Sequence, residues 1–214
     1  MAGVNKLRLI KALKDKRRLI AIGMFILGCL IAAYPISLKI KSTITQNKKV
    51  AELKDSFKKS ESKKENGEKE YPVWHQWPET IIEIPEISVE ATVTTMEDKD
   101  IFNENASYPP AHYKGTAFPG ENGNVAIAGH RTGPADYFKN LDKLKENDVI
   151  LLKTAKANYE YVVEKVFVVD KNDWSVVGNT DYPCLTLTTC EAEGFVSHAK
   201  RLIVRAKLNK VKVI

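Results

Sequence analysis

A short run that ends in a thiol is the part of this sequence best suited to chemistry. Residues 186–190 read Thr-Leu-Thr-Thr-Cys. Side chains alternate along a strand, so Cys190 is expected to share a face with Thr186 and Thr188, while Leu187 and Thr189 face the other way. The thiol is thus predicted on a polar face, where its thiolate could act as a nucleophile.

Two further residues could support such a nucleophile. His130 follows a short run of small strand-forming residues, 125–129, which predicts an imidazole at the rim of a sheet, able to move protons. A histidine at the surface or core edge is the alternative interpretation. Arg201 opens the next strand-like run and could stabilise a developing oxyanion. Arg205 faces the same side of a regular strand, and a bulge could exchange the two roles.

The other two cysteines have structural explanations. Cys29 lies in an apolar stretch, where it serves as a small apolar residue. Cys184 enters the same strand as Cys190. Six residues of strand separate the two by about 20 Å, which is too far for a disulfide. We expect Cys184 to be a buried thiol without a chemical role.

Strand-like runs dominate the sequence from residue 79 onward. They cover 80–84, 87–93, 125–129, 149–154, 159–163 with its continuation 166–169, 185–190 and 201–208. One helix is predicted over 135–144, because its apolar side chains fall on one face. Seven or eight short strands with few helices predict a mainly β protein, built as a closed or nearly closed barrel.

An uncharged apolar segment, 19–38, precedes the folded region. At about 1.5 Å per residue its twenty residues span roughly 30 Å, the thickness of a bilayer core. Seven cations lie in the fifteen residues before it and four in the fifteen after, which favours a cytoplasmic N-terminus. A cleaved signal peptide and a lipoprotein signal are alternatives. A retained signal anchor fits best, because the apolar core is long and 32–34 is a poor cleavage site.

The uneven distribution of charge makes nucleic acid an unlikely partner for this basic chain. Residues 1–18 carry a net charge of +6, residues 39–70 of +4 and residues 71–214 of −4. The positive charge therefore flanks the membrane segment instead of the folded part. The polar region that follows, 39–78, is predicted to be a solvated extracytoplasmic stalk, with a helical extension of the membrane segment as the alternative. The catalytic domain is expected at 79–214, outside the membrane.

Three motifs in combination resemble those of the sortases, the membrane-anchored cysteine transpeptidases of Gram-positive bacteria. They are 128–132 (Ala-Gly-His-Arg-Thr), 186–190 and 201–206 (Arg-Leu-Ile-Val-Arg-Ala), in the family's order. The run 112–125 also resembles the approach to the family histidine, most of all in class D and class E members. The likeness covers roughly 79–208 and implies a closed eight-stranded β-barrel with one or two short helices.

The resemblance also implies a reaction that needs no cofactor. Cys190 would attack the Thr carbonyl of an LPxTG-like motif near the C-terminus of a secreted protein and form a thioester. His130 would act first as general acid and then as general base, and Arg201 would stabilise the tetrahedral intermediates. Thr189 would contact the substrate or the oxyanion. An amine, usually from a peptidoglycan precursor, would resolve the thioester.

The sequence departs from the family in few places. No Asp-Pro-aromatic lid of pilus-building class C members precedes the barrel, and a stretch that contains Trp74 and Trp77 takes that position. The sequence shows no cluster of acidic residues with metal-ligand spacing, so the calcium site of some class A members is not predicted. Glu191 and Glu193 are expected to solvate a loop.

Two other functions stay open at this point. The same residues could form a thiol hydrolase that releases its acyl group to water. A membrane-tethered domain that binds cell-wall or protein partners, with Cys190 merely buried, would be non-catalytic. The sequence also leaves open whether the sorting motif is of the LPxTG, LPxTA or LAxTG type.

Overall fold

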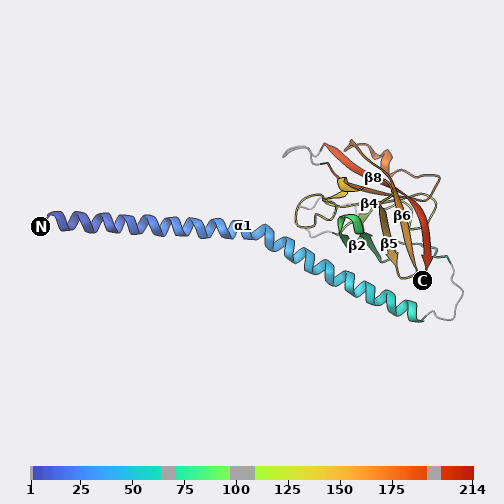
Figure 1. Ribbon diagram of the computed structural model, residues 1–214, viewed down its shortest axis with the longest axis horizontal. Coiled ribbons are helices and arrows are strands. Elements are labelled where there is room, and N and C mark those ends of the chain that lie inside the picture. Colours follow the sequence, from blue (N-terminus) through green and yellow to red (C-terminus); the bar gives the residue numbers. More distant parts are fainter. Residues whose placement is uncertain (1, 64–70, 97–108, 192–198) are drawn as a thin grey trace.

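The computed structural model describes residues 2–63, 71–96, 109–191 and 199–214. They form one long N-terminal helix, α1 (Ala2–Lys63), and a closed barrel of eight strands (Figure 1). Within the described residues, α1 is the one helix long and apolar enough to cross a membrane. The predicted fold class is therefore confirmed.

The barrel is a mixed sheet that closes on itself. Its strands are β1 (Thr80–Ile84), β2 (Val89–Thr95), β3 (Ala111–His112), β4 (Asn124–Ala128), β5 (Val149–Thr154), β6 (Ala157–Asp170), β7 (Cys184–Cys190) and β8 (Lys200–Val213). Their order is β1-β2-β3-β4-β7-β8-β6-β5, and β5 closes the barrel by pairing with β1. The β2–β3 and β4–β7 pairs are parallel, and the others are antiparallel. All the strands predicted from the sequence are present. The sequence did not predict β3, because a strand of two residues is too short to show alternating polar and apolar side chains.

Alternation along β7 and β8 decides which side chains fill the barrel. Leu185 and Leu187 of β7 lie in the core with Leu202 and Val204 of β8. Burial of such a side chain contributes about 1.5–3 kcal/mol, so the register of these strands is strongly specified. Thr186, Thr188 and Cys190 alternate with these leucines and so share the other face of β7, as predicted, although Thr186 and Thr188 are buried there, at 0% and 4% exposure.

The predicted helix over 135–144 is wrong. This segment forms turns followed by a single 3₁₀ turn, η2 (Leu141–Lys143). Its apolar residues are nevertheless buried, with Phe138 at 0% and Leu144 at 3% exposure. The backbone N–H of Phe138 donates to the carbonyl of His130, at 3.0 Å, instead of to a helical partner. The apolar spacing therefore reflects packing of an irregular loop onto the barrel.

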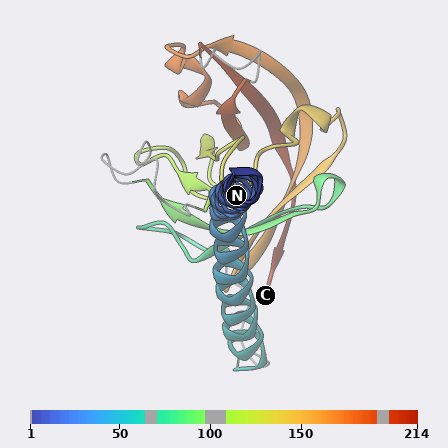
Figure 2. The same ribbon diagram turned by 90° about the vertical axis from the view of Figure 1, so that its left-hand side faces the viewer.

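Residues 39–63 of the predicted stalk continue α1, in line with the helical extension that the sequence left as the alternative. The helix bends and then lies against the barrel beside β2 (Figures 1 and 2). Gln46 is 2% exposed and accepts a hydrogen bond from the Thr92 hydroxyl, at 2.9 Å. Further along, Val50 and Phe57 pack on Ile81. By its composition alone this segment could not bury enough apolar surface to fold. In the structure its inner face packs on the barrel instead.

Aromatic side chains attach the segment that precedes β1 to the barrel. The indole N–H of Trp74 donates to the Tyr159 hydroxyl, at 3.1 Å. Trp77 stacks on His112, with ring centroids 3.9 Å apart, and donates to the Val93 carbonyl. These contacts account for the two tryptophans as packing residues.

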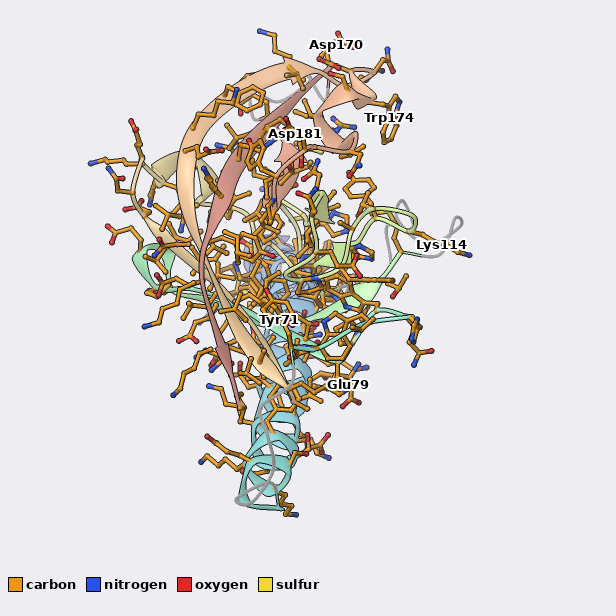
Figure 3. The ribbon with its side chains drawn as sticks, turned by 90° about the vertical axis from the view of Figure 1, so that its right-hand side faces the viewer. Tyr71, Glu79, Lys114, Asp170, Trp174 and Asp181 are labelled. Carbon is orange, nitrogen blue, oxygen red and sulfur yellow. The ribbon has the colours of Figure 1, made fainter. Side chains whose placement is uncertain are left out.

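The connection from β6 to β7 contains η3 (Trp174–Val177), and a further 3₁₀ turn, η1 (Pro85–Ile87), links β1 to β2. Figure 3 shows Asp170 and Trp174 at one end of the molecule, Tyr71 near its middle and Glu79 farther from that end. One guanidinium N–H of Arg205 donates to the Val176 carbonyl, at 2.8 Å, and so fixes η3 against β8.

Candidate active site

Two parallel strands deliver the predicted histidine and cysteine to the same edge of the sheet. β4 and β7 pair from Asn124↔Cys184 to Ala128↔Thr188, and the N–H of Gly129 extends the ladder by donating to the Thr188 carbonyl, at 3.1 Å. His130 and Cys190 each follow two residues beyond the Ala128–Thr188 pair. His130 is exposed and Cys190 is half-buried.

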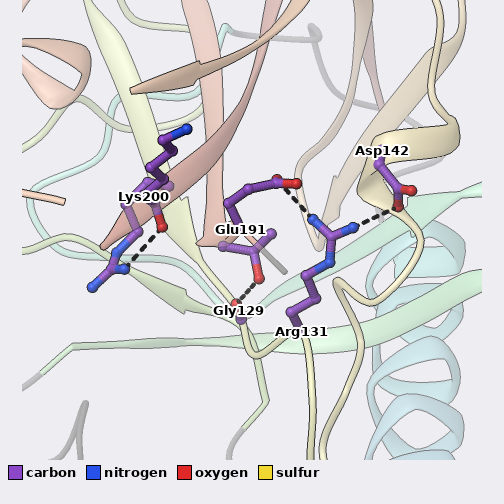
Figure 4. Close-up of polar contacts among 7 residues, drawn as sticks. Gly129, Arg131, Asp142, Glu191 and Lys200 are labelled. Atoms are coloured by element: carbon purple, nitrogen blue, oxygen red, sulfur yellow. Dashed lines mark hydrogen bonds and ion pairs between the residues drawn. The ribbon is translucent and has the colours of Figure 1, made fainter. Parts of the chain in front are cut away.

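The antiparallel neighbour β8 brings Arg201 to the cysteine. Arg201 is the register partner of Cys190, whereas Arg205 lies opposite Thr186. A guanidinium N–H of Arg201 donates to the Lys200 carbonyl, at 3.1 Å (Figure 4). Because Arg205 holds η3 instead, the register distinguishes the two arginines that the sequence left interchangeable.

The predicted substrate residue, Thr189, joins the two strand ends. It is 3% exposed, and its hydroxyl donates to the Gly129 carbonyl, at 2.8 Å (Figure 4). Its contact with a substrate stays a prediction. Gly129 itself allows close packing, because a Cβ at this position would lie 2.5 Å from Cδ2 of Phe138. Any larger residue would disturb the backbone directly before His130.

Tyr113 is a neighbour of the site that the sequence analysis missed. Its hydroxyl shares a hydrogen bond of 2.8 Å with that of Thr188. Burial raises the pKa of Tyr113, and the neighbouring Cys190 also raises it. The hydrogen bond with Thr188 and the charge of Arg201 lower the pKa by less than burial raises it. The tyrosine hydroxyl therefore lies within electrostatic reach of both Cys190 and Arg201. Its position follows from β3, which was not visible in the sequence.

The expectation that Glu191 solvates a loop is wrong. Its side chain is only 18% exposed and accepts a hydrogen bond from Arg131, at 3.0 Å. An ion pair across two strand ends is a long-range contact that local composition does not reveal. Glu193 lies outside the described residues. Within the described part of the chain, no group of three or more His, Cys, Asp and Glu side chains could hold a metal ion.

Cys184 is the buried thiol that the sequence predicted. It is 0% exposed, and its sulfur lies 3.3 Å from Oδ1 of Asn124 and 3.4 Å from Oγ1 of Thr180. Both Cys184 and Cys190 are free, as their strand separation requires.

The fold is a closed β-barrel with a half-buried cysteine at the end of one strand, a histidine just beyond its parallel neighbour and an arginine on its antiparallel neighbour, a set of residue types suited to thiol chemistry. Residues 82–209 match the family model described as Sortase domain. The chain belongs to the sortase family.

Named relatives support the predicted likeness to classes D and E. Sortase D of Bacillus subtilis is 31% identical over 129 residues, which are 59% of this chain and 62% of the relative. A sortase D5 transpeptidase of Clostridium perfringens superposes with a TM-score of 0.58 at 29% identity, over 77% of this chain and 98% of that one. Sortase E of Streptomyces avermitilis gives 0.55 at 27%, over 64% and 91%.

Proposed function

We propose that this protein is a transpeptidase that cleaves an LPxTG-like C-terminal sorting motif of secreted proteins and transfers them to a cell-wall amine. The observation that carries the proposal is the position of Cys190, at the end of β7 between the strand that leads to His130 and the residue opposite, Arg201. The nucleophile and the cation then come from adjacent strands, and the proton carrier comes from the segment that directly follows the third, β4.

The proposed reaction has two halves. The Cys190 thiolate attacks the Thr carbonyl carbon, and Arg201 stabilises the oxyanion that forms. The C–N bond of the motif then breaks, the leaving amine takes a proton from His130, and a thioester remains. In the second half His130 removes a proton from an incoming amine, which attacks the thioester. The new amide bond forms and the thiolate leaves.

The packing of α1 supports a site close to a membrane. The charge bias around 19–38 favours a cytoplasmic N-terminus, which would leave the barrel outside. Lys39 directly follows the predicted span 19–38. Its ammonium group pairs with Asp136 at 2.8 Å, and Asp136 lies six residues beyond His130. This contact favours a catalytic end at the membrane surface over one held away on a stalk, as suits an enzyme whose substrate proteins emerge from the bilayer.

Peptide cleavage by purified full-length protein in detergent tests the proposal. Fluorogenic peptides with LPxTG, LPxTA and LAxTG motifs would be compared for the wild type, Cys190→Ala and the matched control Cys184→Ala. We expect the Cys190 variant to lose cleavage of every peptide and the Cys184 variant to retain most of it. Cleavage by Cys190→Ala at the wild-type rate would contradict the proposal.

Product analysis separates transfer from hydrolysis. With an oligoglycine amine added, the proposal predicts an amide product at the expense of the free acid. An acid product alone, at all amine concentrations, would favour the thiol hydrolase. Absence of any cleavage by the wild type, together with an unreactive Cys190, would favour the non-catalytic binding domain.

A further inference from the structure

Arg131, which directly follows His130, makes the next connection between the two strand ends. Its side chain is 11% exposed and is bound on both sides. One end group pairs with Glu191, at 3.0 Å, and the other with Asp142 of η2, at 3.3 Å (Figure 4). Glu191 directly follows Cys190. A single guanidinium therefore joins the residue after the histidine to the residue after the cysteine.

This ion pair continues the alignment of β4 and β7 beyond their backbone ladder. The ladder reaches Gly129, whose N–H and carbonyl bind the carbonyl of Thr188 and the hydroxyl of Thr189. The pair Arg131–Glu191 lies two residues further along both strands. His130 and Cys190 thus lie between a backbone connection on one side and a side-chain connection on the other.

The burial of the pair makes it stronger than an ordinary surface ion pair. Exposed pairs contribute little, because water screens them and long side chains lose freedom. Here Arg131 and Glu191 are 11% and 18% exposed, and the planar guanidinium fixes the geometry of both acceptors. Removal of one partner leaves the other charge poorly solvated. The segments that follow β4 and β7 are then expected to separate.

From this geometry we infer that Arg131 is a positioning residue that sets His130 at a working distance from Cys190, with Glu191 as its partner. The inference rests on the proposed roles of His130 and Cys190. Arg131 is adjacent in the chain to His130, and Glu191 is adjacent to Cys190, so the ion pair acts on both through the backbone. It needs no contact with the substrate. A shift of about 1 Å between a nucleophile and its proton carrier can cost about a hundredfold in rate.

The test compares Arg131→Gln, Glu191→Gln and the double variant in full-length protein, with enzyme concentration taken from active-site thiol titration. We expect each single variant to lower kcat by about tenfold to a hundredfold with KM nearly unchanged, and to shift the pH profile of kcat/KM. The double variant should lose no more than Arg131→Gln alone, because that variant already removes the pair with Glu191. Arg131→Lys should recover part of kcat.

Glu83→Gln is the matched control. Glu83 pairs with Lys153, and their side chains are 28% and 29% exposed, on β1 and β5, which contribute no residue to the site. This variant should keep the wild-type kcat and pH profile. If Arg131→Gln and Glu191→Gln also keep both and lose only thermal stability, the pair is merely structural and the inference is overturned. Cleavage by Cys190→Ala would instead overturn the proposed function, so the two failures are distinguishable.

Discussion

The two ends of β7 each carry a cysteine, and their surroundings differ in every respect that matters for reactivity. At the start of the strand, Cys184 is fully buried, and its sulfur contacts the side chains of Asn124 and Thr180. At the end, Cys190 is half-buried beside Arg201, where β4 and β7 leave the sheet. The same thiol on the same strand face is a packing group at one end and a candidate nucleophile at the other. The proposed difference in reactivity therefore rests on the residues that the neighbouring strands place beside each thiol, because the residue type is the same.

Thiol modification should separate the two ends most strongly. In a Cys29→Ser background, a methanethiosulfonate reagent should modify Cys190 under native conditions at least about 10³-fold faster than Cys184, because a fully buried thiol reacts only after the structure opens. Peptide mapping after timed labelling measures both rates. Similar rates at the two cysteines would break the comparison.

The two arginines of β8 should show the next largest difference. Arg201→Ala is expected to lower kcat by about 10²–10³-fold with the fold intact, because it removes the cation opposite Cys190. Arg205→Ala removes the hydrogen bond to η3 and should lower thermal stability, with kcat of the folded enzyme retained. Kinetics and thermal unfolding of both variants check this. The reverse assignment of effects would exchange the roles of the arginines.

The buried residue His112 makes the stability of the barrel depend on pH. Burial lowers the pKa of His112 to about 4, whereas an unfolded chain has a histidine pKa near 6.5. Between these values the unfolded state binds a proton that the folded state does not, so stability falls as the pH drops below about 6.5. The full effect is about 3 kcal/mol. Urea midpoints at pH 7 and pH 4.5 should differ less in His112→Gln. An equal pH dependence in both proteins would contradict this account.

The smallest effect is expected from Cys184→Ala. It removes the thiol contact with Asn124, whose other hydrogen bonds to Val176 and Gly178 remain. We expect a loss of about 1 kcal/mol in the free energy of unfolding and unchanged kcat. Urea unfolding monitored by tryptophan fluorescence measures the loss. A large fall in kcat would give Cys184 a role that its burial argues against.

Residues on regular strands were predictable from the sequence. The alternation of β7 placed Cys190 outward, and the motif order brought His130 and Arg201 into the same argument. The choice of Arg201 over Arg205 needed the β7–β8 register, which short-range patterns do not contain.

Contacts between distant segments could not be predicted in the same way. The pair Arg131–Glu191 joins residues sixty positions apart, and two-residue β3 is too short to show a period. The docked half of α1 does space Val50, Leu53 and Phe57 along one face, but its first turns contact the barrel through polar side chains, which resemble a solvated segment. Burial of Phe138 without a helix likewise depends on the barrel surface that receives it.

Capture of the acyl-enzyme tests most directly whether the open end of β7 is the reactive one. Full-length protein would be mixed with an LPxTG-like peptide without an amine acceptor, quenched in acid and measured by intact mass spectrometry. The account predicts a mass increase equal to the acyl fragment, mapped to Cys190 and released by hydroxylamine, with Cys184 unmodified. An adduct on a residue other than Cys190 would contradict the account. Cleavage of the peptide by the Cys190→Ala variant at the wild-type rate would also contradict it.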